Sequence, residues 1–238
     1  MLRFIFLNAF IAIFTIVWIL YGLMLSIFDN SGRIMHFKCA APWAKVILWV
    51  CGVKVKVKGL IQGERDSPGI YMSNHQSIFD IFTLLACLPV DFKFILKQEL
   101  MKIPLFGFAM KRARYISIDR ENPRRAVKSM NDAAEKIKNG TSVLIFPEGT
   151  RSVDGQLLPF KRGGFHLALK SECNVVPISI IDSRLIAPKG SLRIKKGKVI
   201  MNIGEPIPVK GYSKKDMVQL MDRVRDAMIN QMKESHES

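Results

Sequence analysis

Two residues in the middle of the chain have the types and spacing for proton transfer: His75 and, five positions later, Asp80. A short apolar run at 70–72 precedes them and a longer one at 81–85 follows, which predicts a buried strand and then a helix. Ser77 and Asp80 have the spacing of a capping box, so the helix is expected to begin at Ser77, with His75 in the turn before it. A carboxylate there can orient an imidazole as a general base. Alternatively, His75 only satisfies a buried carboxylate or a backbone group.

A second candidate segment, residues 146–152, reads Phe-Pro-Glu-Gly-Thr-Arg-Ser and follows a predicted buried strand at 143–145. A strand that ends in a glycine-containing turn can aim backbone N–H groups and an arginine at a phosphate, whose oxygens a guanidinium binds two at a time. Glu148 is predicted to fix the arginine or its loop, and Lys161, ahead of a Gly-Gly helix start, adds positive charge. The alternative is a surface turn in which Glu148 and Arg151 pair only with each other.

The composition limits the classes of partner. The 36 Lys and Arg against 20 Asp and Glu give a net charge of +16, which favours nucleic acid, anionic lipid headgroups or phosphorylated substrates. A hydrophobic fraction of 49% argues against a disordered basic tail and towards membrane contact. The four scattered cysteines predict neither a disulfide framework nor a zinc site. The sequence has no Walker A, dinucleotide-binding or serine-hydrolase glycine pattern.

An uncharged stretch from Phe4 to Phe28 predicts a membrane anchor, because as a helix it would extend about 38 Å against a hydrocarbon core of about 30 Å. It lacks a small-x-small cleavage site, which favours an uncleaved anchor over a signal peptide. A second apolar stretch at 40–53 is expected to form an interfacial or re-entrant helix, with Trp43 and Trp49 at headgroup level. Basic residues are concentrated after the first stretch, which places the bulk of the chain on the cytoplasmic face of the membrane.

Strands and helices alternate over the rest of the chain, which predicts an α/β fold with a mixed sheet flanked by helices. The alternating residues 53–58 predict an edge strand with its valines inward and its lysines outward. Further strands are expected at 70–73, 92–96, 115–118, 142–146 and 175–181, and a hairpin at 192–203. Helices are expected at 77–87, 122–138, 163–172 and from 213 onwards. The predicted domains are an N-terminal membrane-anchoring segment, residues 1–52, and an α/β domain, residues 53–238.

Four segments together resemble the glycerolipid acyltransferase family, specifically its 1-acyl-glycerol-3-phosphate acyltransferases. Two are the segments already described, Asn74-His75-x-x-x-x-Asp80 and 146–152. Lys97-Gln98-Glu99-Leu100 with Pro104-Leu105-Phe106-Gly107 and Ile118-Asp119-Arg120 resembles the family's second motif, and Val176-Pro177-Ile178 its fourth. The segments follow in the family's order. One stretch departs from the pattern, because many relatives carry another glycine between Gly107 and the strand at 115–118.

The resemblance implies that the α/β domain is a catalytic domain. It would transfer a fatty acyl group from acyl-CoA or acyl-carrier protein to the sn-2 hydroxyl of lysophosphatidic acid, giving phosphatidic acid. His75 would be the general base and Asp80 would hold its tautomer. The implied partners are these lipids and the thioester donor. No bound cofactor or metal is expected, and no nucleic acid, since aromatic residues interleaved with basic ones are scarce.

The resemblance also implies the residues that bind substrate. Arg151, with Gly149 and Thr150, would bind the acceptor phosphate, and Glu148 would hold that loop. Asn74 and Lys161 are further candidates. Lys97, Gly107 and Arg120 are candidates for oxyanion or phosphate contacts.

Two alternatives remain open. The same motifs serve acyltransferases that act on glycerol-3-phosphate or on other lyso-lipids. A membrane-tethered basic protein that binds nucleic acid or anionic lipid without catalysis would explain the charge and the anchor. It would not explain His75 and Asp80 framed by a strand and a capped helix.

Overall fold

The computed structural model of the chain describes residues 1–59, 68–119 and 123–236. In this part of the chain a seven-stranded sheet has the order β1-β7-β6-β2-β5-β3-β4. Neighbouring strands are parallel except β6 and β7, which are antiparallel, so the predicted mixed sheet is confirmed. The strands are β1 (Val53–Lys58), β2 (Ile70–Ser73), β3 (Phe92–Lys97), β4 (Ile116–Ile118), β5 (Ser142–Ile145), β6 (Val175–Ile181) and β7 (Gly197–Ile203).

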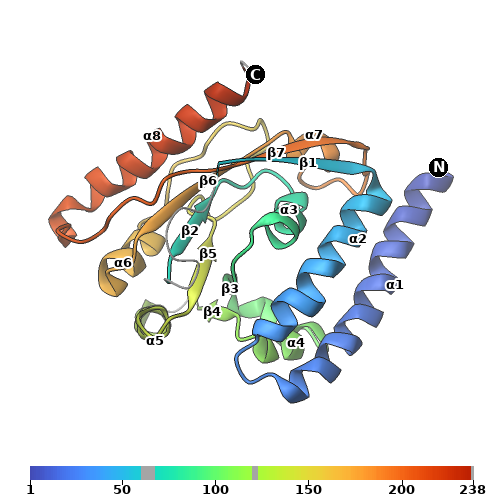
Figure 1. The fold of residues 1–238 in the computed structure, drawn as a ribbon, viewed down its shortest axis with the longest axis horizontal. Helices are drawn as coiled ribbons and strands as arrows, with labels where there is room; N and C mark the ends of the chain where they lie inside the picture. Colours follow the sequence, from blue (N-terminus) through green and yellow to red (C-terminus); the bar gives the residue numbers. More distant parts are fainter. Residues whose placement is uncertain (60–67, 120–122, 237–238) are drawn as a thin grey trace.

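Helices cover both faces of this sheet (Figure 1). They are α1 (Leu2–Leu25), α2 (Ala41–Cys51), α3 (Phe79–Cys87), α4 (Phe106–Arg112), α5 (Pro123–Lys138), α6 (Arg162–Ser171), α7 (Ser183–Ile186) and α8 (Met217–His236). Side chains of a strand alternate between faces. Tyr71 of β2 therefore joins the core beneath α1, α2 and α3, whereas Ile70 and Met72 join the core beneath α5, α6 and α8. Both faces of the central strands are buried.

The arrangement of β2 and β5 brings the two candidate segments together. These strands are parallel neighbours, with Tyr71 opposite Leu144. Their carboxyl ends therefore lie at the same edge of the sheet, where open α/β sheets hold their ligands. His75 follows β2 and the segment 146–152 follows β5, so both emerge side by side.

The prediction of a hairpin at 192–203 was wrong. Only β7 forms a strand there, and it lies between β1 and β6. Both edges of β7 are thus occupied, which leaves no edge for a strand at 192–196. The edge position of β1 is as predicted, but Val57 is exposed rather than inward.

The predicted helix starts at 77, 122 and 163 are correct to within two residues. The last helix, expected from Ser213, begins as α8 at Met217, after a 3₁₀ turn at Lys214–Asp216. α3 begins at Phe79 rather than Ser77. Ser213 and Asp216 form a capping box ahead of α8. In the stretch that lacks the family's glycine, Arg114 adopts a left-handed conformation with φ 63°, which glycine adopts more readily. The predicted cap Asn122 lies outside the described residues.

The N-terminal helices combine an exposed apolar surface with a packed one. Among the described helices, the span Leu2–Phe28 is long and apolar enough to cross a membrane, and 11% of its most apolar window is buried. Trp49 of α2 is 81% exposed. Trp43 was predicted to lie at headgroup level, but it faces inward. Its indole N–H donates to Thr15 Oγ1 (3.2 Å), and its ring packs edge-on against Phe82.

Candidate active site

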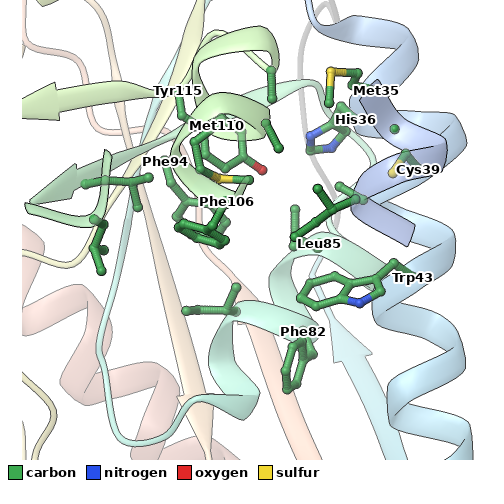
Figure 2. A pocket seen from close by; sticks show the side chains of 18 of the residues that line it. Met35, His36, Cys39, Trp43, Phe82, Leu85, Phe94, Phe106, Met110 and Tyr115 are labelled. Carbon is green, nitrogen blue, oxygen red and sulfur yellow. The ribbon is translucent and has the colours of Figure 1, made fainter. Parts of the chain in front are cut away.

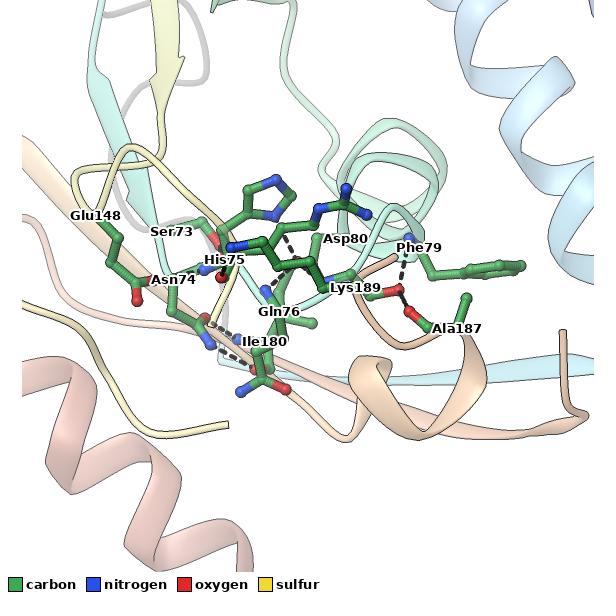
Figure 3. A network of polar contacts seen from close by, with 12 residues as sticks. Ser73, Asn74, His75, Gln76, Phe79, Asp80, Glu148, Ile180, Ala187 and Lys189 are labelled. Atoms are coloured by element: carbon green, nitrogen blue, oxygen red, sulfur yellow. Dashed lines mark hydrogen bonds and ion pairs between the residues drawn. The ribbon is translucent and has the colours of Figure 1, made fainter. Parts of the chain in front are cut away.

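His75 and Asp80 form a hydrogen-bonded pair between β2 and α3 (Figure 3). His75 Nδ1 lies 2.7 Å from Asp80 Oδ2, and the carboxylate is completely buried. An ionised carboxylate only accepts hydrogen bonds, so the proton of the neutral imidazole resides on Nδ1 and Nε2 is left as the proton acceptor. This is the geometry that general base catalysis requires.

Asp80 shapes the turn as well as orienting the ring. Its Oδ2 also accepts the backbone N–H groups of Gln76 (2.7 Å) and Ser77 (2.8 Å). The Ser77 hydroxyl accepts from Phe79 N (3.2 Å) and donates to the Ala187 carbonyl (2.8 Å). Asp80 also lies in the first turn of α3, where the helix dipole favours a negative charge. The predicted S-x-x-D capping pair is therefore present and fixes the imidazole's position.

The segment after β5 holds the backbone of His75 on both sides. Glu148 Oε1 accepts from His75 N (2.6 Å), and the His75 carbonyl accepts from Ser152 N (2.7 Å). Glu148 Oε2 accepts from Leu158 N (2.8 Å). Glu148 therefore does not pair with Arg151; it links the histidine turn to the chain that follows. Burial raises the pKa of Glu148, and the two N–H groups oppose that effect.

Phe146 supports the imidazole from one face. The two rings are stacked with centroids 4.0 Å apart and planes 14° apart. With its backbone bonded on both sides, its ring stacked and its Nδ1 hydrogen-bonded, His75 has little freedom to rotate. Its side chain is 15% exposed and borders a cavity. Catalytic groups fixed in this way before substrate binds lose little further freedom in the reaction.

The loop at Gly149 presents positive charge beside His75. Gly149 has φ +71°, and Lys161 packs so closely over it that an added Cβ would lie 3.0 Å from Lys161 Cδ. Lys189 Nζ donates to Thr150 Oγ1 and to the Arg151 carbonyl, both at 3.1 Å. A phosphate beside this loop would meet cationic side chains from three separate segments of the chain.

Sequence reasoning missed Lys189. It lies after α7 in a Pro-Lys-Gly turn, and only the fold brings its Nζ to within 3.1 Å of Thr150 Oγ1. A lysine in a surface turn has no local signal that separates it from a solvated charge.

Two residues predicted to contact substrate, Asn74 and Gly107, instead have structural roles. The Asn74 amide pairs with both backbone groups of Ile180 (2.8 and 2.6 Å) and is 1% exposed, so it ties β2 to β6. Gly107 N donates to the Ile103 carbonyl (2.7 Å), and an added Cβ would lie 2.1 Å from the Met101 carbonyl oxygen. Its amide is thus not available for an oxyanion, and glycine is needed there for close packing.

Two predicted substrate-binding residues remain, Lys97 and Arg120. Lys97, at the end of β3, lines the same cavity as His75. Arg120 lies outside the described residues.

The cavity beside His75 has a volume of about 490 Å³, within the usual range of ligand pockets. Its walls come from α1, α2, α3, β3 and α4, with His75, Gly149 and Lys97 at the carboxyl edge of the sheet. Most of the lining side chains are apolar or aromatic, among them Trp43, Phe82, Leu85, Phe94 and Phe106 (Figure 2). An extended hydrocarbon chain suits such a cavity.

The model of the family described as Acyltransferase matches residues 54–181, which contain His75, Asp80 and the 146–152 segment. The chain belongs to the acyltransferase family. Among curated relatives of this acyltransferase, a chloroplastic 1-acyl-sn-glycerol-3-phosphate acyltransferase of Brassica napus is 40% identical over 76% of the chain and 53% of the relative. A human 1-acyl-sn-glycerol-3-phosphate acyltransferase alpha is 33% identical over 79% of the chain and 67% of the relative.

The fold of this acyltransferase also matches a solved structure. The 1-acyl-sn-glycerophosphate (LPA) acyltransferase PlsC of Thermotoga maritima is 29% identical, with a TM-score of 0.84, and the match covers 100% of this chain and 98% of that one. The chain spans about half the length of the plant chloroplast relatives it matches, 53% and 51%.

Proposed function

We propose that this protein transfers a fatty acyl group from acyl-CoA or acyl-carrier protein to the sn-2 hydroxyl of 1-acyl-glycerol-3-phosphate, giving phosphatidic acid. The observation that carries the proposal is the His75–Asp80 pair (2.7 Å) at one end of an apolar cavity, beside the basic loop at Gly149. The names of the relatives support this acceptor.

In the proposed reaction His75 Nε2 takes the proton from the acceptor hydroxyl as its oxygen attacks the thioester carbonyl. The C–O bond forms, the C–S bond breaks, and the imidazolium returns the proton to the departing thiolate. Asp80 stabilises the imidazolium during these steps. A thiolate is a good leaving group, so the scheme needs neither a covalent acyl-enzyme nor a metal.

The charges around the site suit the acceptor headgroup. Arg151, Lys161 and Lys189 surround the Gly149 turn and would bind the phosphate, while Glu148 keeps the loop in register with His75. The acyl chain would occupy the apolar cavity. Lys97, at the cavity's edge, would contact the oxyanion or a phosphate.

The proposed location is the cytoplasmic face of a membrane. α1 offers an apolar outer surface for lipid, and basic residues follow it in the sequence, as the positive-inside rule requires. A net charge of +16 would attract anionic lipids and phosphorylated donors to the same surface.

The proposal is tested by replacing the base. His75→Ala should lower kcat/KM for lysophosphatidic acid at least about a thousandfold, because general base catalysis and orientation are both lost. His166→Ala is the matched control, since His166 is exposed on α6, and it should keep wild-type activity. Activity of His75→Ala within tenfold of wild type, with normal folding, would overturn the mechanism.

A panel of acceptors separates the substrate from the mechanism. Purified protein would be given lysophosphatidic acid, glycerol-3-phosphate and other lysophospholipids, each with acyl-CoA and with acyl-carrier protein. Preference for lysophosphatidic acid supports the proposed acceptor. Transfer to a different acceptor, still abolished by His75→Ala, would retain the mechanism and replace the acceptor.

A further inference from the structure

The cavity contains a polar side chain that the proposed chemistry does not use. His36 belongs to the π-helical turn Met35–Ala40 between α1 and α2 and lines the cavity. The residue is 2% exposed, and its Nε2 has no hydrogen-bond partner among the described residues. Figure 2 shows its ring at the wall of this mostly apolar cavity.

His36 lies at the end of the cavity away from His75. A series of neighbouring rings connects them, with His36 against Phe92 (4.8 Å between centroids), Phe92 against Phe94 (5.2 Å), and Phe94 against Phe146 (6.1 Å). Phe146 then stacks on His75 (4.0 Å). Phe92 begins β3, whereas His75 lies at the opposite, carboxyl edge of the sheet. An acyl chain that reacts at His75 would therefore point its far end towards His36.

Neighbouring charges orient the His36 ring. Nδ1 lies 3.7 Å from Asp91 Oδ1, and Lys93 Nζ lies 2.8 Å from that oxygen. Asp91 favours the proton on Nδ1, which leaves Nε2 as an acceptor. Burial lowers the pKa of His36 to about 4; Asp91 and the Val90 carbonyl oppose this effect and Lys93 adds to it. The ring is therefore neutral at physiological pH.

Tyr115 supplies a second polar group in the same place. Figure 2 shows the Tyr115 hydroxyl and the His36 ring facing the same part of the cavity. Burial raises the pKa of the Tyr115 phenol, with Asp91 and Cys39 adding to the effect, so the hydroxyl stays protonated and can donate. The far end of the cavity thus offers both an acceptor and a donor.

These groups make a purely hydrocarbon occupant unfavourable there. A buried polar group without a hydrogen-bond partner costs about 1–3 kcal/mol. An unsubstituted chain that reached His36 would displace any water and leave the imidazole unpaired. A chain with a hydroxyl at that place would satisfy both His36 and Tyr115.

We propose that His36 and Tyr115 form a polar subsite that binds a hydroxyl group near the methyl end of an acyl chain. This inference rests on the proposed acyl transfer. The hydroxyl donates to the His36 imidazole and accepts from the Tyr115 phenol. The chain belongs either to the thioester donor or to the lysophosphatidic acid acceptor, and both present the same chemistry.

The first test compares acyl chains with and without a terminal hydroxyl, in a series of lengths. One arm places the hydroxyl on the donor chain and the other on the acceptor chain. For one chain length, and in either the donor or the acceptor arm, wild type should have a higher kcat/KM with the hydroxylated chain than with the unsubstituted chain. Tyr115→Phe should reduce that preference several-fold and His36→Leu about tenfold or more. Met35→Leu, an apolar exchange at the same end, should leave it unchanged.

A second measurement does not depend on turnover. Calorimetry in detergent would compare the affinities of a fatty acid and its terminally hydroxylated analogue for wild type, Tyr115→Phe and His36→Gln, which retains a hydrogen-bonding group. The hydroxylated analogue should bind more tightly to wild type and His36→Gln than to Tyr115→Phe. Equal preference in all variants, by either measurement, overturns the subsite even if acyl transfer is intact. Absence of transfer with every donor and acceptor would overturn the proposed function alone.

Discussion

His75 is fixed by its backbone as well as by its ring. Glu148 and Ser152 bond its amide and carbonyl, while Asp80 and Phe146 hold the imidazole. Three of these four residues, Phe146, Glu148 and Ser152, come from the loop that follows β5, more than sixty residues further along the chain. His75 is thus aligned by the end of the neighbouring strand. A substitution in the 146–152 segment should therefore shift His75 even where the replaced side chain contacts no substrate.

Asp80→Asn should lower kcat by several orders of magnitude, up to about 10⁴-fold. Asparagine can still accept the Gln76 and Ser77 amides, so the turn is retained, but it does not stabilise an imidazolium. Initial-rate kinetics measure the effect, and thermal unfolding checks the fold.

Asp222→Asn on α8 is the control, because that carboxylate is exposed and far along the chain from the site. A wild-type kcat for Asp80→Asn would show that the carboxylate has no part in the chemistry.

At the scale of elements, α1 has one face that lines the cavity and another face that is exposed. Thr15, Trp18, Ile19 and Gly22 recur at helical spacing and line the cavity, while Ile13, Ile16, Val17 and Leu20 are exposed. The first face forms part of the cavity beside His75, and the second is an exposed apolar surface. The N-terminal helices therefore share a core with the α/β domain, although the sequence suggests a separate anchor.

The contact between α4 and the preceding turn depends on Gly107. Gly107→Ala should destabilise the protein by roughly 2 kcal/mol or more, because its Cβ would lie 2.1 Å from a backbone oxygen of Met101 that has no flexible side chain to move aside. Thermal or denaturant unfolding in detergent measures the change.

Gly163→Ala in α6 is the matched control. No atom lies within 4 Å of its added Cβ, and alanine favours a helix over glycine by about 1 kcal/mol, so stability should be equal or higher. Equal stability of Gly107→Ala and wild type would refute the packing requirement.

For the whole molecule, burial of His36 makes stability depend on pH. Its pKa is about 4 in the folded protein and about 6.5 in an unfolded chain. Between these values the unfolded chain binds more protons, so the unfolding free energy falls as the pH is lowered, by about 1.4 kcal/mol per pH unit at most.

Unfolding measured between pH 7.5 and pH 5 would show this contribution. His36→Gln should flatten the pH dependence, since Asp91 and Lys93 remain. The exposed His166→Gln should keep the wild-type slope. Identical slopes for wild type and His36→Gln would contradict the burial of a neutral imidazole.

The sequence alone predicted most elements of the fold and the position of the histidine turn. Strand periodicity, the capping pair at Ser77 and Asp80 and the capping box at Ser213 all act over a few residues, so local patterns reveal them. The hairpin at 192–203 could not be excluded locally, because β7 is defined by β1 and β6 on either side.

Local signals determined which residues could do chemistry, and tertiary packing decided what each one does. The sequence identified His75, Asp80 and the 146–152 segment, but it gave substrate roles to Asn74 and Gly107. The Asn74 amide instead bonds the Ile180 backbone, and Gly107 N bonds the Ile103 carbonyl. It offered no sign of Lys189 beside Thr150 or of His36 in the cavity. The physical reason is that hydrogen bonding, burial and charge depend on neighbours in space, and the decisive neighbours are far apart along the chain.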